Sequence, residues 1–295
     1  MVRLPSHSIL AWTLCYLALV GCTGEAPAPA HSLGEPTIIR PGVEQFRTKI
    51  GDNQLWAYLP AKRSSKLPCI IIAPAGSGMF HGMKIAKGDR PEHVPYVEAG
   101  YAVVCYGVTG PIDDYDDLGV IELYRTINRF MKAELGVADG KAAIDWALEN
   151  IPGIDPERLY AVGHSSAGTL SLQLAQQDPR IQACVSFMPV VDTNAYHEEK
   201  DLFSDFELGA PGYTELTKKL NPATHASLLK CPTLLFSAKD DPRYEDLVAF
   251  HEVLKESNPQ VSFESVKSGG HYDPMISDGI PAAIRWFKTL EKDAR

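Results

Sequence analysis

The 295-residue sequence predicts an α/β fold, a mostly parallel sheet covered by helices on both faces. Short continuous apolar runs such as Cys69-Ile70-Ile71-Ile72-Ala73 are typical of strands that are buried on both faces. Longer stretches with helical spacing alternate with these runs; in residues 141–150, for example, the apolar side chains fall on one face. Such alternation is the pattern that parallel strands joined by helical crossovers produce.

Eight strands and at least six helices are expected from Val43 onward. The expected strands are residues 46–50, 54–59, 69–73, 101–106, 158–162, 183–187, 233–237 and 261–266. The expected helices are residues 92–99, 120–135, 141–150, a helix beginning near Ser166, 249–255 and 282–290. Residues 192–221 show no regular pattern, and they form either a small lid over a site or a packed connection.

Charge and cysteine content exclude several classes of function. The net charge is −9 and no cluster of basic residues stands out, which argues against a nucleic-acid partner. The sequence has no CxxC pair and no Cys/His spacing typical of a metal site, so we expect neither a metal nor a cofactor. Four cysteines lie in or beside apolar runs, and they are expected to be buried free thiols, with one disulfide as the alternative. These are Cys69, Cys105, Cys184 and Cys231.

The N-terminus predicts export. Arg3 and an apolar run over residues 9–20, too short for a permanent membrane span, are typical of a signal peptide over residues 1–21. The run ends in Leu19-Val20-Gly21-Cys22, which resembles a bacterial lipobox and implies cleavage before Cys22 and lipid on its thiol. The alternative is an ordinary secretory peptide in which Cys22 is incidental.

The predicted domain organisation follows from this signal. Residues 22–35, rich in Ala, Pro and Gly, are expected to be a flexible tether, and residues 36–295 are expected to be one catalytic domain. The expected location is the periplasm or the outer membrane of a bacterium, with membrane attachment through the lipid anchor at Cys22.

The strongest chemical signal is Gly163-His164-Ser165-Ser166-Ala167-Gly168, between a predicted strand and a predicted helix. A serine hydroxyl is a weak nucleophile unless it is presented without crowding and a base takes its proton. A strained strand-to-helix turn presents it in this way, and the turn closes only with small residues two before and two after the serine. Gly163 and Ala167 meet that requirement around Ser165, whereas His164 stands two before Ser166. Ser165 is therefore the predicted nucleophile.

The sequence resembles the α/β-hydrolase superfamily, in particular dienelactone hydrolases and the catalytic domains of prolyl-oligopeptidase-like enzymes. Ala143-Ile144-Asp145-Trp146 and Ile154-Asp155-Pro156-Glu157-Arg158, leading into the elbow, carry the resemblance, which covers about residues 43–290. It implies an α/β-hydrolase fold with a mostly parallel eight-stranded sheet. Because Ala167 replaces the usual second elbow glycine, we expect the turn to survive with slightly tighter access to Ser165.

The triad acid follows the apolar strand at residues 233–237. On this fold the chain order is serine, acid, histidine. The resemblance implies that the acid stands three residues after a small residue, and counting from Ala238 gives Asp241. Asp240 is the alternative, since the register is uncertain by one position. Either aspartate could instead cap the next helix.

The general base is predicted at His271, in Lys267-Ser268-Gly269-Gly270-His271 after the last strand. Paired glycines free the backbone to turn a side chain inward. Similar Gly-Gly-His loops hold the base in the resembled family, where the histidine accepts the serine proton and the acid fixes its tautomer.

Two backbone N–H groups are expected to stabilise the oxyanion that acyl transfer develops. The first is that of Ser166, at the start of a helix. The second comes from the glycine-rich loop Pro74-Ala75-Gly76-Ser77-Gly78-Met79, where the resemblance implies Ser77 and leaves Gly78 as the alternative. The loop lacks the Lys-Ser/Thr ending of a phosphate-binding loop. His81, just beyond it, is either a substrate contact or a surface residue.

Together these features predict a serine hydrolase that cleaves a carboxylic ester through an acyl-enzyme on Ser165. Esters are favoured over peptides because no propeller or other gating domain precedes the hydrolase region in this sequence. The first alternative is a peptidase or amidase that takes short peptides, as in the prolyl-oligopeptidase-like branch. The second is a non-catalytic binding protein that has kept the fold.

Overall fold

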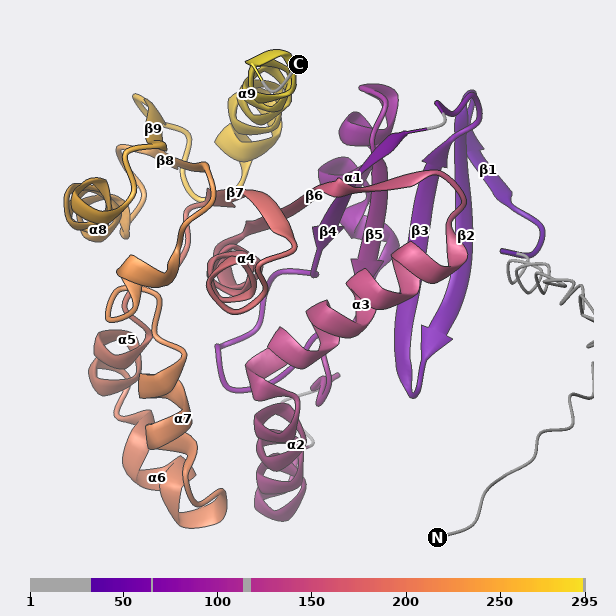
Figure 1. Cartoon of the computed structure of the whole chain (residues 1–295). Helices are drawn as coiled ribbons and strands as arrows, with labels where there is room; N and C mark the ends of the chain where they lie inside the picture. Colours follow the sequence, from indigo (N-terminus) through magenta and orange to yellow (C-terminus); the bar gives the residue numbers. More distant parts are fainter. Residues whose placement is uncertain (1–32, 65, 114–117, 294–295) are drawn as a thin grey trace, which may run out of the picture. The chain divides into compact units, whose positions relative to one another are not determined.

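The computed structural model describes residues 33–64, 66–113 and 118–293. Within them lies a nine-stranded sheet with strand order β1-β2-β3-β5-β4-β6-β7-β8-β9 (Figure 1). The strands are β1 (Thr37–Arg40), β2 (Val43–Ile50), β3 (Asn53–Pro60), β4 (Leu67–Ile72), β5 (Ala102–Tyr106), β6 (Ile154–His164), β7 (Ile181–Phe187), β8 (Thr233–Ala238) and β9 (Val261–Val266). The signal peptide, Cys22 and most of the tether lie outside the described residues.

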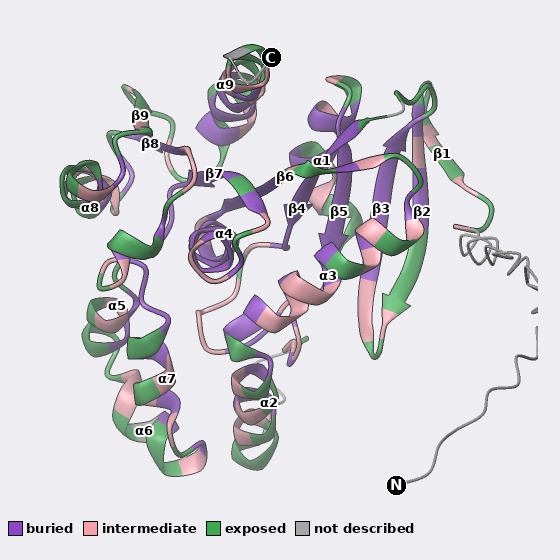
Figure 2. Cartoon of the chain, in the orientation of Figure 1, coloured by how far each residue is buried: buried purple, intermediate pink, exposed green. Residues whose placement is uncertain are grey.

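Helices cover both faces of the sheet (Figure 1). They are α1 (Arg90–Glu98), α2 (Val120–Lys132), α3 (Val137–Asn150), α4 (Ser165–Gln177), α5 (Thr193–Glu199), α6 (Leu202–Gly209), α7 (Tyr213–Lys219), α8 (Tyr244–Ser257) and α9 (Ile280–Asp293). Helices α1 and α9 pack on one face, and their apolar side chains share a buried cluster with outward-facing residues of the central strands. Helices α2, α3, α4 and α8 pack on the other face around a second cluster. The central strands are buried between the two layers (Figure 2).

The predicted α/β fold with a mostly parallel sheet is confirmed. Strands β4 to β9 pair in parallel, whereas β1, β2 and β3 add an antiparallel edge next to β5. The expected strands over residues 46–50 and 54–59 are β2 and β3, which form an antiparallel hairpin whose turn is closed by the pairing of Ile50 with Asn53. The predicted number of eight strands was one too low, because β1 is short and half-solvated; Ile38 at its centre is 60% exposed. An exposed four-residue edge strand has no apolar periodicity to reveal it.

Residues 192–221, expected to be irregular, instead contain the three short helices α5, α6 and α7. Asp192 caps α5 by accepting hydrogen bonds from the N–H groups of Asn194 and Ala195. Phe206 and Tyr213 from this insertion are buried in the main core. The insertion is therefore a packed helical connection. Helices of seven or eight residues are too short for a clear amphipathic pattern, which is why the sequence did not indicate them.

The four cysteines in the described chain are free thiols, as predicted. Cys69, Cys105 and Cys184 are buried and Cys231 is partly exposed. No helix among the described residues is long and apolar enough to cross a bilayer. The same residues contain no group of three or more side chains that could hold a metal ion.

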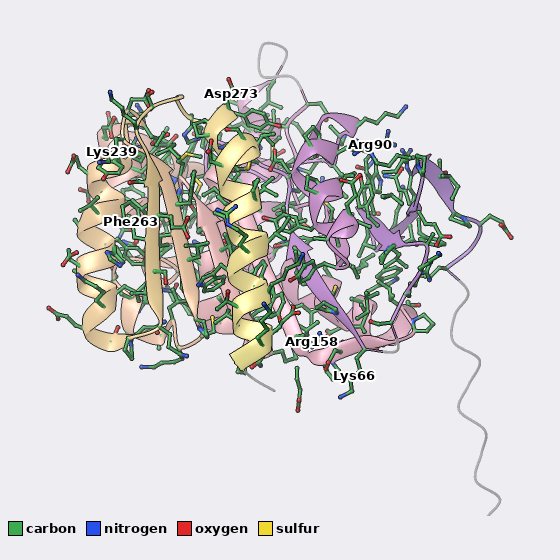
Figure 3. The ribbon with its side chains drawn as sticks, turned by 90° about the horizontal axis from the view of Figure 1, so that it is seen from above. Lys66, Arg90, Arg158, Lys239, Phe263 and Asp273 are labelled. Carbon is green, nitrogen blue, oxygen red and sulfur yellow. The ribbon has the colours of Figure 1, made fainter. Side chains whose placement is uncertain are left out.

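The carboxyl ends of the parallel strands meet at one end of the sheet, where the predicted site residues lie. In Figure 3, Lys239 and Asp273, which neighbour Asp241 and His271 in the sequence, lie at one end of the strands, and Lys66 and Arg158 lie at the opposite end. In open α/β sheets, ligands bind at the carboxyl ends of the strands. The fold thus gathers the predicted chemistry on the side where this architecture places its active sites.

Candidate active site

Strand β6 passes directly into helix α4 at Ser165, whose φ is +54°. A positive φ is strained for a residue with a side chain and is the conformation expected for a serine at a nucleophile elbow. At this elbow the backbone of Gly163 packs against the first turn of α4. A Cβ atom on Gly163 would lie 2.0 Å from the carbonyl oxygen of Ala167. Position 163 therefore requires glycine, whereas Ala167 is accommodated in the core.

The two neighbouring serines occupy different environments. Ser166 is buried, and its hydroxyl accepts a hydrogen bond from the N–H of Gly76 at 3.1 Å. That contact ties the glycine-rich loop after β4 to the start of α4. Ser165 is partly exposed at the turn itself. Of the two hydroxyls, only that of Ser165 stands at the strained position, as the sequence predicted.

The predicted acid and base meet although they are 30 residues apart. Nδ1 of His271 lies 2.5 Å from Oδ2 of Asp241. The Asp241 side chain is fully buried, whereas that of His271 is 43% exposed. Since a carboxylate only accepts, this contact fixes the proton on Nδ1 and leaves Nε2 able to accept another. The other oxygen of Asp241 accepts the N–H of Arg243 at 2.8 Å, which holds the carboxylate in place.

Asp240, the alternative acid, points to a different partner. Its carboxylate accepts hydrogen bonds from the N–H groups of Gly269 and Gly270 at 3.0 and 3.1 Å. These two bonds hold the pKa of the Asp240 carboxyl below its usual range. Gly269 and Gly270 have φ of +138° and +75°, so the loop before His271 requires glycine at both positions. Asp240 thus anchors the histidine loop, and Asp241 contacts the imidazole.

His164 connects the elbow to the same loop. Its Nε2 lies 2.7 Å from the main-chain oxygen of His271, and because that oxygen can only accept, Nε2 carries the proton. Burial lowers the pKa of His164 to about 4, so its imidazole is neutral near pH 7. The residue immediately before Ser165 is therefore hydrogen-bonded to the backbone of His271, which brings the nucleophile turn and the base side by side.

A buried carboxyl lies behind the elbow. Glu92 of α1 lies with Tyr96 and His164 around a gap that is too small to hold a water molecule. Burial, reinforced by the nearby Asp89 carboxylate, raises the pKa of Glu92 to about 7. Sequence analysis missed this residue, because its burial depends on packing between α1 and the elbow, which are distant in the chain.

Replacement of Glu92 by Gln is expected to stabilise the protein in a pH-dependent way. Because the folded-state pKa is raised, the wild type loses stability as the pH rises from the unfolded value of about 4.5 to about 7. E92Q removes that loss, so it should gain roughly 2 kcal/mol at pH 8 and almost nothing at pH 4. Urea unfolding at the two pH values measures the difference. E98Q, at the exposed end of the same helix, is the matched control, and an equal effect of both variants would contradict the interpretation.

Of the two predicted donors in the glycine-rich loop after β4, one has an uncommitted N–H. The N–H of Gly78 points to Nε2 of His81 at 3.4 Å, whereas that of Ser77 has no acceptor within the described chain. Ser77 is therefore the better placed of the two predicted donors. His81 was expected to contact substrate or solvent; it is 2% exposed and its Nδ1 contacts the carbonyl of Gly82, so the surface alternative was wrong.

The helical insertion of residues 192–221 contacts the glycine-rich loop through Tyr213. The hydroxyl oxygen of Tyr213 lies 2.8 Å from Nε2 of His197 and 3.2 Å from the carbonyl oxygen of Met79, so its one proton is shared between these two acceptors. Nδ1 of His197 lies 2.5 Å from the carbonyl oxygen of Thr193. Met79 has φ of +68°, so the loop is strained where the tyrosine binds it. No local motif indicates this contact, because 134 residues separate Met79 from Tyr213.

Tyr213→Phe is expected to lower kcat of the enzyme by roughly tenfold with little change in KM. The variant keeps the aromatic packing but no longer anchors Met79, so the Ser77 N–H is held less firmly where charge develops. Steady-state kinetics on an activated ester measures both constants. Tyr196→Phe removes a hydroxyl from the same insertion, where the ring contacts Arg243, and serves as the control. Equal losses in both variants would contradict a role through Met79.

A pocket adjoins the two predicted oxyanion donors. Residues from the glycine-rich loop, α2, α4 and the insertion line it: Pro74, Ser77, Met79, His81, Met83, Val108, Phe130, Leu135, Ser166, Ala167, Leu170, Gln173, Thr193, His197 and Thr217. Its volume is about 430 Å³ including the mouth. Among the described residues that line it there is no carboxylate, lysine or arginine.

Comparisons with known proteins identify a family for the greater part of the chain. The family described as X-Pro dipeptidyl-peptidase (S15 family) matches residues 54–210, which is slightly more than half of the chain and includes the elbow at Ser165. A Bacillus subtilis (strain 168) protein described as uncharacterized peptidase YuxL is 25% identical over 224 residues. That alignment covers 71% of this chain and 32% of the relative, so the chain spans about one third of the relative's length.

Solved structures share the fold at low identity. The acetyl xylan esterase from Paenibacillus sp. R4 superimposes with a TM-score of 0.60 at 16% identity, covering 86% of this chain and 87% of that one. A putative dienelactone hydrolase from Klebsiella pneumoniae subsp. pneumoniae superimposes with a TM-score of 0.61 at 16% identity, covering 83% and 98%. These similarities show the α/β-hydrolase fold and leave the substrate to be argued from the site itself.

Proposed function

The chain belongs to the X-Pro dipeptidyl-peptidase (S15) family and is a serine hydrolase, and we propose that it cleaves carboxylic esters through an acyl-enzyme on Ser165. The observation that carries the proposal is the meeting of three elements at one end of the sheet. Ser165 stands at the strained end of β6, and the neighbouring His164 is hydrogen-bonded to the loop of His271. His271 in turn contacts the buried carboxylate of Asp241 at 2.5 Å.

The proposed reaction follows from the proton positions. With Nδ1–H bound to Asp241, Nε2 of His271 takes the proton of Ser165 as its Oγ forms a bond to the ester carbonyl carbon. The carbonyl oxygen becomes an oxyanion, which the N–H groups of Ser77 and Ser166 stabilise. Collapse breaks the bond to the alcohol, which leaves with the proton from Nε2. Water then attacks the acyl-enzyme by the same steps, and the acid and Ser165 are released.

Ester cleavage is favoured over peptide cleavage by the uncharged pocket. A peptidase that removes dipeptides must bind the free ammonium of its substrate, and a carboxylate is the natural partner for that charge. None of the described residues that line the pocket carries one. Peptide or amide cleavage is the second candidate, and it is supported by the family and by the peptidase relative.

A substrate comparison tests the proposal. Purified protein should hydrolyse p-nitrophenyl acetate with kcat/KM at least a hundredfold above that for an alanyl or glycyl-prolyl p-nitroanilide. Because p-nitrophenolate is a far better leaving group than p-nitroanilide, the uncatalysed hydrolysis of each substrate is measured in parallel, and the ratio is compared after each rate is divided by its uncatalysed rate. Faster cleavage of the anilides would replace the esterase proposal with the peptidase one.

We also propose that the mature protein is an exported lipoprotein, anchored to the membrane through lipid on Cys22. Support comes from the apolar run of residues 9–20 and the Leu19-Val20-Gly21-Cys22 sequence that follows it. Expression of the full chain and of C22S in a bacterium, followed by membrane fractionation, tests it. The wild type should partition with membranes and C22S should not. Unchanged partition of C22S would contradict the anchor.

A further inference from the structure

His164 stands next to the nucleophile in the sequence and contacts the loop that carries the base. It is the last residue of β6, and Ser165 follows it with the strained φ of +54°. The His164 side chain is buried, and its Nε2 donates to the main-chain oxygen of His271 at 2.7 Å. The two imidazole rings also pack together, with their centroids 4.8 Å apart. The strand that presents the nucleophile therefore also holds the backbone of the base.

The position of the base depends on hydrogen bonds. The side chain of His271 is 43% exposed, and the loop before it has left-handed backbone at both of its glycines. Asp240 binds the N–H groups of these glycines, and Asp241 binds Nδ1 of the imidazole. His164 binds the carbonyl oxygen of His271 itself, on the other side of its Cα atom. Without that bond, the chain that follows the base would lose this attachment to the nucleophile strand.

The imidazole of His164 is unfavourable to bury, which points to a role beyond packing. With Nε2 as a donor, a neutral ring leaves Nδ1 as an acceptor. Nδ1 is buried and has no hydrogen-bond partner in the part of the chain that the structure describes. The gap that His164 shares with Glu92 and Tyr96 is too small to hold a water molecule, so water does not supply the bond there. A buried acceptor without a partner destabilises the fold, and an apolar side chain of similar size would avoid that penalty.

We infer that His164 is a positioning residue, which holds the main chain of His271 so that Nε2 of this base stays within reach of the Ser165 hydroxyl. The inference rests on the proposed function, since it takes Ser165 as the nucleophile and His271 as the base. His164 acts through His271 and takes no part in the proton transfer. Displacement of a reacting group by about 1 Å can lower the rate of a reaction about a hundredfold, so one hydrogen bond to the loop of the base is enough to affect turnover.

Two substitutions of similar size and shape test the inference. His164→Gln places an amide N–H near the position of Nε2, whereas His164→Met fills the same space without a donor. We expect H164M to lower kcat on p-nitrophenyl acetate by about tenfold or more with KM within about twofold of the wild type, and H164Q to keep kcat within about threefold. The rate of labelling by a fluorophosphonate probe should fall in parallel with kcat, because the same base assists that reaction.

Unfolding measurements separate positioning from a structural role. H164M removes a buried imidazole with an unpartnered nitrogen, so its urea midpoint should equal or exceed that of the wild type although activity is lost. His93→Met is the matched control. His93 lies on α1 beside the ring of Tyr58, it is buried, and neither of its ring nitrogens has a partner in the described chain. H93M should leave kcat unchanged.

The outcomes distinguish this inference from the proposed function. Any of three results would overturn the positioning role while the proposed function stands: wild-type kcat in H164M, equal losses in H164M and H164Q, or an equal loss in H93M. A urea midpoint of H164M well below that of the wild type would assign His164 a structural role instead. A wild type that neither hydrolyses the ester nor takes up the label would overturn the proposed function and the inference together.

Discussion

Replacing Ser165 with Ala is expected to lower kcat for ester hydrolysis by about 10⁴-fold or more and to abolish labelling by a fluorophosphonate probe. The hydroxyl at the strained turn is the only one there that can form the acyl bond, and nothing in an alanine replaces it. The residual rate would come from the oxyanion donors and from substrate binding alone. Labelling followed by gel fluorescence, together with steady-state kinetics, measures both effects.

Ser166→Ala is the matched control for that experiment. It removes a hydroxyl one position away, whose contact is the N–H of Gly76, and keeps the backbone N–H that the proposed mechanism uses. We expect labelling to persist and kcat to fall by roughly tenfold, because the glycine-rich loop is tied less firmly to α4. Either of two outcomes would show that Ser165 is not the nucleophile: labelling of S165A at the wild-type level, or loss of labelling in S166A alone.

Asp241→Asn is expected to lower kcat by about 10⁴-fold near pH 7 while the fold is kept. An amide in this place can donate to Nδ1 of His271 and so favours the tautomer whose Nε2 carries the proton and cannot accept another. The loss should shrink at alkaline pH, where hydroxide assists removal of the serine proton. A pH–rate profile of the variant, with circular dichroism to confirm folding, provides the measurement.

Asp240→Asn distinguishes the two neighbouring aspartates. Its carboxylate binds the N–H groups of Gly269 and Gly270, so the variant weakens the anchor of the histidine loop without changing the tautomer. We expect a loss of about tenfold or less in kcat. If D240N lost more activity than D241N, the acid would have to be reassigned to the alternative position.

Much of the fold was predictable because its signals are local. The buried strands are continuous apolar runs, and the helices that cover them have apolar faces, so eight of the nine strands could be placed along the chain without tertiary information. β1 and the helices α5 to α7 were missed for the opposite reason. Each is short, and each is stabilised by contacts with residues far away, such as the core packing of Tyr213.

The same distinction applies to the site. The three residues of the predicted triad lie in short motifs that can be recognised from local residue types. Small residues flank Ser165, an apolar strand precedes Asp241, and two glycines precede His271. The choice between Asp240 and Asp241 needed coordinates, because only the structure places one carboxylate against an imidazole and the other against two glycine N–H groups. Two features of the site depend on contacts between segments that are far apart in the chain: the packing of Glu92 beside the elbow and the contact of Tyr213 with Met79. No local motif predicts either of them.

The position of β9 ties activity to one edge of the sheet. β9 is the last strand in the sheet order, its residues are only partly buried, and His271 follows directly after it. Edge segments open by local unfolding at lower free energy than the centre of a sheet. Detachment of this edge alone would carry away the base while Ser165 stays in the core of the sheet. Activity therefore depends on whether this edge is folded. We expect the enzyme to lose activity at a lower denaturant concentration than the one at which amide hydrogens of the central strands begin to exchange.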